Sequence, residues 1–66
     1  MSLIEPMTGQ ELKDWRLELG WTQKQAANAL GFRHRSSISQ LERGHQYVTP
    51  KVAKLARMIL DYELAT

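Results

Sequence analysis

The chain has 66 residues and a net charge of +2, which is enough for one small domain with a limited core. It contains no cysteine, which excludes disulfides and cysteine-based zinc sites, and no apolar run approaches the ~20 residues that cross a bilayer. Since no signal peptide is predicted either, we expect a single cytoplasmic domain over residues 1–66, in which residues 1–6 are a flexible extension.

The first helix is predicted from Thr8 to about Leu19. Thr8 and Glu11 have the spacing of a capping box, and Gly20 suits the left-handed position that ends a helix. Apolar residues recur at the spacing of one helix face, and Arg16 lies among them. A charge on such a face needs a partner if it is buried.

A second helix follows with the same kind of start signal. Thr22 and Gln25 form another capping box, and Gly31 ends the helix. Only a few residues separate Gly31 from the next helical pattern, so the two helices must cross at a steep angle. This pattern predicts a helix-turn-helix, which projects its second helix as a probe for the DNA major groove.

The third helix is short and is predicted from about Arg35 to Arg43. Its start is ambiguous, because His34, Ser36 and Ser37 can each cap it, and only Ser37 is followed by a glutamine at capping-box spacing. Its inward positions are apolar, which leaves a set of polar side chains on the outside: Arg35, Ser36, Ser39, Gln40 and Arg43.

The fourth helix begins after Thr49, with Pro50 at its first position. It carries more apolar residues than one core-facing stripe needs, with Met58, Tyr62 and Leu64 on flanking positions. We interpret these either as a wide core face, or as a homodimer seam or docking site for a partner protein. Because no strand-like alternation occurs, the predicted fold class is an all-α bundle of four helices, with a fifth left open.

The charges are segregated along the chain. Residues 22–57 carry seven lysines or arginines and one acid, whereas residues 1–21 carry four acids and two bases. A basic surface of this kind is typical of proteins that face phosphates, although a solvated basic face would give the same count.

The stretch from Leu12 to Gly44 resembles the repressor-type helix-turn-helix of lambdoid phage repressors, Cro proteins and Xre-like regulators. The matching elements are Leu19-Gly20-Trp21-Thr22-Gln23, Ala27, Leu30-Gly31, Ile38-Ser39-Gln40-Leu41-Glu42 and Gly44. The chain departs from the family in two respects. The turn before Ile38 is one residue longer than usual, and the region after Gly44 contains one long helix where the family usually completes five helices.

The resemblance implies roles for single residues. It places Arg35, Ser36, Ser39 and Gln40 at or near positions that read base edges, where arginine suits guanine and glutamine suits adenine. We expect phosphate contacts from Gln23, Lys24, Arg33 and Arg43. Arg16 and Glu42 match a buried pair that ties the first helix to the third. The alternatives are solvated surface residues, a capping role for Ser36, and a plain turn residue at Arg33.

The function expected from these features is sequence-specific binding of double-stranded DNA by a small prokaryotic or phage transcriptional regulator of repressor, antitoxin or controller type. We expect a homodimer on a palindromic site. The alternative is a helical protein-interaction module that acts through the fourth helix on a toxin or another regulator. A nonspecific nucleoid-type binder is a third interpretation. We expect no enzyme activity, cofactor or metal, because His34 and His45 have no neighbouring ligands and no nucleophile–base pair is visible.

Overall fold

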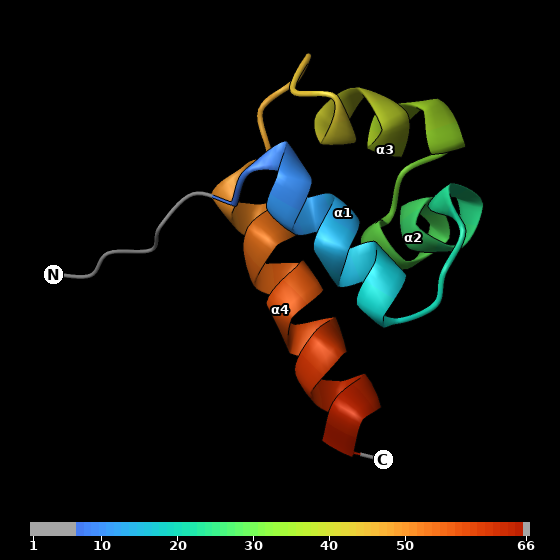
Figure 1. The fold of residues 1–66 in the computed structure, drawn as a ribbon, viewed down its shortest axis with the longest axis vertical. Coiled ribbons are helices and arrows are strands. Elements are labelled where there is room, and N and C mark those ends of the chain that lie inside the picture. Colours follow the sequence, from blue (N-terminus) through green and yellow to red (C-terminus); the bar gives the residue numbers. More distant parts are fainter. Residues whose placement is uncertain (1–6, 66) are drawn as a thin grey trace, which may run out of the picture.

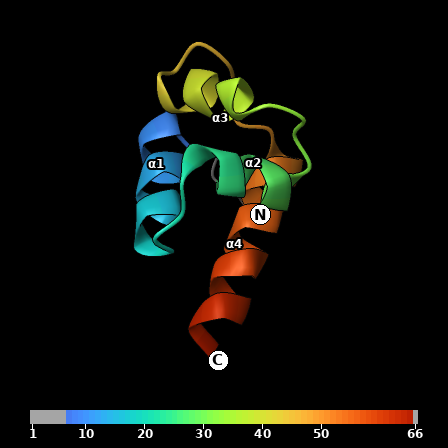
Figure 2. The same ribbon diagram turned by 90° about the vertical axis from the view of Figure 1, so that its right-hand side faces the viewer.

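The computed structural model describes residues 7–65, which form four α-helices and no strand. The helices are α1 (Gly9–Glu18), α2 (Gln23–Leu30), α3 (Arg35–Glu42) and α4 (Pro50–Ala65). In both side views α3 lies across one end of the molecule, and the C-terminal end of α4 points to the opposite end (Figure 1, Figure 2). The predicted all-α bundle of four helices is confirmed, and residues 7–65 contain no fifth helix. The predicted extension over residues 1–6 lies outside the described residues.

Capping side chains fix where three of the helices begin. Both predicted capping boxes are present: the hydroxyls of Thr8 and Thr22 each accept from a backbone N–H three residues later, at 3.1 Å. The Glu11 and Gln25 side chains accept in return from the two threonine N–H groups, at 2.8 Å. Thr49 caps α4 by accepting from a backbone N–H at 3.3 Å. These caps satisfy donors that a helix start leaves without partners.

α3 begins at Arg35, as predicted. Of the three capping candidates, His34 occupies the N-cap position, and its side chain makes no capping hydrogen bond. Ser36 and Ser37 lie inside the first turn, so neither is the cap. Arg43 follows the helix as its C-cap residue, which ends α3 one residue earlier than predicted.

The core forms where α1, α3 and α4 meet the small residues of α2. Leu12 and Ile38 have the largest fully buried side chains, and alanines of α2 and α4 allow the helices to approach closely. The buried Trp15 donates its indole N–H to the Ala56 carbonyl oxygen at 2.7 Å, which joins α1 to α4. Trp21 packs edge-on against the Trp15 ring, with centroids 5.7 Å apart.

None of the helices among the described residues is both long and apolar enough to span a membrane.

Candidate nucleic-acid interface

The turn between α2 and α3 is held by backbone hydrogen bonds and one apolar side chain. Gly31 ends α2 in the left-handed conformation, with φ of 85°. The Phe32 N–H donates to the Ala27 carbonyl oxygen at 2.8 Å, and the half-buried Phe32 ring packs against the core. The next two residues, Arg33 and His34, are exposed. The turn therefore directs α3 across the bundle while its own polar side chains stay in solvent.

Two buried residues determine which face of α3 points outward. Ile38 and Leu41 lie in the core, with exposed fractions of 0% and 4%. Because α-helical side chains repeat every 3.6 residues, the opposite face must be exposed. The predicted base-reading residues Arg35, Ser36 and Gln40 are all exposed, whereas Ser39 is half-buried.

The predicted contact residues other than Gln40 line two pockets, both formed mainly by polar residues. The first pocket, about 390 Å³, lies between α2 and the start of α3. It brings together two predicted base readers, Arg35 and Ser36, and two predicted phosphate contacts, Lys24 and Arg33. The rest of the lining consists of residues that the sequence analysis did not assign to DNA: Ala27, Asn28 and His34. Three of these side chains carry a formal positive charge, so the pocket suits an anion or an electron-rich base edge.

The second pocket, about 280 Å³, lies where α1, the start of α2 and the end of α3 meet. It contains the remaining predicted phosphate contacts Gln23 and Arg43, together with Ser39. Lys13 and Gln10 of α1 complete the lining beside the Arg16 and Glu42 side chains. Ser39 lies one helical turn from Arg35 and Ser36 on α3, and it shares the second pocket with phosphate-binding candidates.

Arg16 and Glu42 form an ion pair at the base of this second pocket. The Arg16 Nε and Nη2 atoms donate to the two carboxylate oxygens of Glu42, at 2.6 and 3.2 Å. The Arg16 Nη1 atom donates to the Trp21 carbonyl oxygen at 3.0 Å, and Gln23 Nε2 donates to Glu42 Oε1 at 3.2 Å. The two charged side chains are 12% and 6% exposed. The cluster therefore links α1, the beginning of α2 and the last residue of α3.

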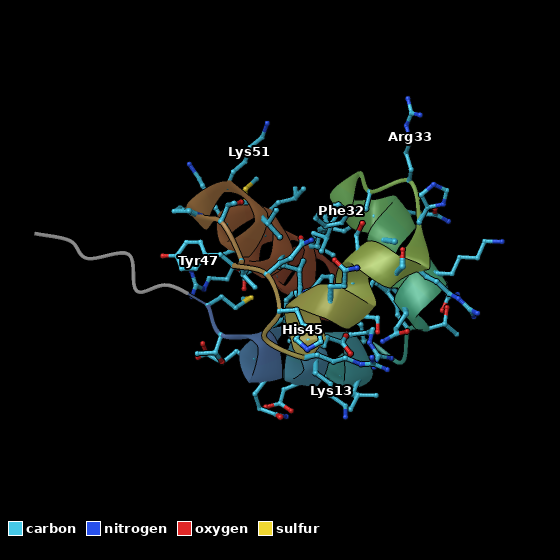
Figure 3. The ribbon with its side chains drawn as sticks, turned by 90° about the horizontal axis from the view of Figure 1, so that it is seen from above. Lys13, Phe32, Arg33, His45, Tyr47 and Lys51 are labelled. Atoms are coloured by element: carbon cyan, nitrogen blue, oxygen red, sulfur yellow. The ribbon has the colours of Figure 1, made fainter. Side chains whose placement is uncertain are left out.

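Cationic side chains flank α3 on both sides when the molecule is seen from above (Figure 3). Lys13 extends outward along one side, whereas Arg33 and Lys51 extend on the other. His45 and Tyr47, from the loop after α3, lie on the same face of the molecule. A helix with positive charge along both edges matches a groove bordered by two phosphate strands.

The sequence analysis did not single out Lys13, Asn28 or Lys51 for this surface. Lys51 had a usable signal, because it directly follows Pro50 at the start of α4, where helix N-termini attract anions. Asn28 carried no comparable signal, since only the packing of α2 against the turn places it in the first pocket.

The exposed apolar residues of α4 lie far from α3. Met58, Tyr62 and Leu64 are 57%, 70% and 62% exposed. Met58 and Tyr62 line an apolar groove of about 410 Å³. The other lining residues come from the loop between α1 and α2, from α2 and from α4: Trp21, Ala29, Leu55, Ile59 and Glu63. Leu64 is outside this lining. A wide core face does not account for Met58, Tyr62 and Leu64, because more than half of each side chain is in solvent.

Within residues 7–65, no three histidine, cysteine or acidic side chains are grouped so that they could hold a metal ion.

Comparison with known proteins gives one match. The model of a protein family described as helix-turn-helix matches residues 12–65, which is more than half of the chain. No curated protein and no solved structure matches the chain.

Proposed function

This chain belongs to the Xre/lambda-repressor-like helix-turn-helix family, and we propose that it is a transcriptional regulator that inserts α3 into the major groove of duplex DNA. The family is one of DNA-binding regulators, whose members are typically not enzymes. In this proposal residues 1–66 act as one DNA-binding domain, in the cytoplasm of a prokaryotic or phage-infected cell.

The observation that carries the proposal is the exposed face of α3, with Lys13 on one side and Arg33 and Lys51 on the other (Figure 3). The major groove is about 12 Å wide and accepts an α-helix, whose diameter with side chains is about 10–12 Å. With α3 in the groove, Lys13 faces one phosphate strand and Arg33 and Lys51 face the other. This arrangement supports a phosphate contact for Arg33 over a plain turn residue.

Base reading is assigned to Arg35, Ser36 and Gln40. All three are exposed, and Ser36 is free of the capping role that competed with base contact. Arginine can pair bidentately with guanine, glutamine with adenine, and serine with either. Ser39 is assigned a lesser part, because it is half-buried in the second pocket.

Phosphate binding is assigned to Gln23, Lys24, Arg33 and Arg43. Gln23 is the first residue of α2, where backbone N–H groups have no intrahelical acceptor and the helix dipole favours an anion. Arg43 lies beside it in the second pocket, and Lys24 and Arg33 lie in the first. The two pockets therefore offer two separate contacts to the DNA backbone.

A homodimer on a palindromic site completes the proposal. One such domain reads only a few base pairs, and two domains on half-sites ~34 Å apart gain affinity and specificity. Met58, Tyr62 and Leu64 belong to the C-terminal half of α4, which points away from α3, so their exposed face can be covered while α3 occupies DNA (Figure 1). The apolar groove that Met58 and Tyr62 line favours a second candidate function, which is docking of a partner protein such as a toxin or another regulator.

The test is a selection from randomised duplexes with the wild type and the variants Arg35→Ala and Gln40→Ala. We expect an enriched palindrome that loses definition at different bases in the two variants. Lys54→Ala is the matched control, because it removes an exposed cation of α4 that lines neither polar pocket. The control is expected to keep the wild-type palindrome, and loss of the same bases in all three variants would contradict base reading by α3.

Salt dependence and stoichiometry separate the competing functions. DNA binding predicts a log–log slope of affinity against salt of about −0.9 per phosphate neutralised. Equal affinity for all duplexes with this slope would indicate a nonspecific binder. A folded chain with no affinity for any duplex would favour the protein-interaction module. Sedimentation of the Tyr62→Ser variant tests the homodimer interface proposed on α4. We expect this variant to be monomeric, because the substitution removes an apolar side chain from that interface.

A further inference from the structure

The loop after α3 folds back over the helix that precedes it. Gly44 adopts a left-handed conformation with φ of 82°, which reverses the direction of the chain. The Gly44 N–H donates to the Leu41 carbonyl oxygen at 3.1 Å, and the His45 N–H donates to the Gln40 carbonyl oxygen at 2.9 Å. These bonds hold the backbone of the loop against the C-terminal turn of α3. The side chain of the next residue, Gln46, is thereby kept close to Gln40.

The side chains of Gln46 and Gln40 are themselves hydrogen-bonded. Gln46 Nε2 donates to Gln40 Oε1 at 2.6 Å, and both residues are exposed. An amide oxygen only accepts and an amide nitrogen only donates. Turning the Gln40 amide alone by half a turn would oppose two NH₂ groups, so the bond is kept only if both amides turn together. The bond therefore couples the two amides and holds the Gln40 side chain against the loop.

We propose that Gln46 is a specificity-determining residue that positions the Gln40 amide for base reading. This inference rests on the proposed function, since it requires that Gln40 meet a base edge. Reading adenine requires a donor toward N7 and an acceptor for the N6 amino group. With its oxygen held by Gln46, Gln40 keeps both amide hydrogens and one oxygen lone pair. The held amide has the donor and the acceptor that adenine needs, on a side chain whose position is restrained by the loop.

Gln46 acts through Gln40, so its removal has a different effect from loss of the reading side chain. Gln46→Ala leaves Gln40 in place but frees its amide to turn either way. We expect the preference for adenine at the Gln40 position to fall about fivefold, which corresponds to one net hydrogen bond. Gln46→Glu reverses the polarity of the contact, because a carboxylate accepts only and Gln40 Nε2 then donates to it. Gln40 still keeps one amide hydrogen and both oxygen lone pairs, which supply the donor and the acceptor that adenine needs, so we expect Gln46→Glu to keep the preference for adenine.

The experiment compares wild type, Gln40→Ala, Gln46→Ala and Gln46→Glu in selections from randomised duplexes. Competition binding then compares the affinities of two duplexes that differ only at the base pair whose preference disappears in Gln40→Ala. The ratio of the two affinities is independent of how much variant protein is folded, and it is insensitive to the uniform repulsion that the added Glu charge causes. The control is His45→Ala, which removes a neighbouring loop side chain and keeps the backbone hydrogen bond to Gln40.

We expect Gln46→Ala to relax the preference at the Gln40 base alone, whereas Gln46→Glu, which retains an acceptor for Gln40, and His45→Ala keep the wild-type ratio. A wild-type motif whose Gln40 base is unchanged in Gln46→Ala would overturn this inference and leave the proposed function intact. Equal relaxation in His45→Ala would also overturn it, since the effect would then belong to the loop as a whole. Absence of any enriched sequence with the wild type would overturn the proposed function and this inference with it.

Discussion

Replacing Glu42 by glutamine tests the ion pair that connects three helices. The substitution keeps the shape of the side chain and removes its charge. In the native chain the Glu42 carboxylate accepts from two Arg16 nitrogens and from Gln23 Nε2. In the variant, Arg16 keeps its full charge at 12% exposure and loses its carboxylate partner. The remaining acceptors are the Trp21 carbonyl oxygen and the single amide oxygen of the new side chain.

The expected loss of stability follows from this burial. Removing one partner of a buried ion pair costs about 3–5 kcal/mol, and we expect about 3 kcal/mol because glutamine retains one acceptor. At about 0.05–0.15 kcal/mol per residue, a chain of this length has a total unfolding free energy of roughly 3–10 kcal/mol. Each kcal/mol shifts Tm by about 4–8 °C in a domain of this size, so Tm should fall by about 12 °C or more.

Thermal and urea unfolding, followed by circular dichroism at the helical band, measure this change. Glu18→Gln is the control, since Glu18 is exposed on the same helix as Arg16 and its loss should change stability by less than about 0.5 kcal/mol. The double variant Arg16→Met with Glu42→Leu should recover much of the loss, because it leaves no unpaired charge. A loss below about 1 kcal/mol in Glu42→Gln would refute the reasoning, since it would mean that solvent screens the pair.

Three further changes test the fold and the interface. Gly9→Ala should destabilise by about 1–3 kcal/mol in urea unfolding, because its Cβ would collide with the Leu41 carbonyl oxygen; a gain in stability from alanine's helix propensity would contradict this. Trp15→Phe should cost about 1–3 kcal/mol in thermal unfolding, since it removes the donor to the Ala56 carbonyl oxygen, and an unchanged Tm would refute that contribution. Arg33→Ala should make the salt dependence of DNA affinity shallower by about 0.9 in the log–log slope, and an unchanged slope would remove Arg33 from the phosphate contacts.

The helix boundaries were predictable because their signals are local. A capping box needs only two side chains three residues apart, so Thr8 and Thr22 could be identified without tertiary information. The start of α3 near Arg35 was also predicted, but its capping residue could not be identified, because several polar residues compete for the cap there. Its position follows from burial of Ile38 and Leu41, and His34 becomes the N-cap residue without a side-chain bond.

The exposed face of α3 was predictable for the same reason, since helical periodicity alone separates inward from outward positions. The division of the candidate contacts between two pockets was not. It depends on how α1 and α2 pack beside α3, which brings Lys13 and Gln23 into the same pocket as Ser39. The hydrogen bond between Gln40 and Gln46 also lies beyond sequence reasoning. Gly44 indicates that the chain turns, but a glutamine beyond it can point in many directions.

The Arg16–Glu42 cluster joins stability to the proposed DNA contact through Gln23. The Gln23 side chain donates to Glu42 in the free chain, and in the proposed complex it binds a phosphate. Turning toward the phosphate removes one of the three donors to Glu42, and the two from Arg16 remain. The carboxylate therefore stays paired while Gln23 changes partner, so α3 keeps its position as the DNA contact forms. A lone Gln23–Glu42 bond would have left a carboxylate at 6% exposure without a donor, at a cost comparable to the bond gained. Arg16 thus allows Gln23, at the start of α2, to serve both the fold and the proposed contact to the DNA backbone.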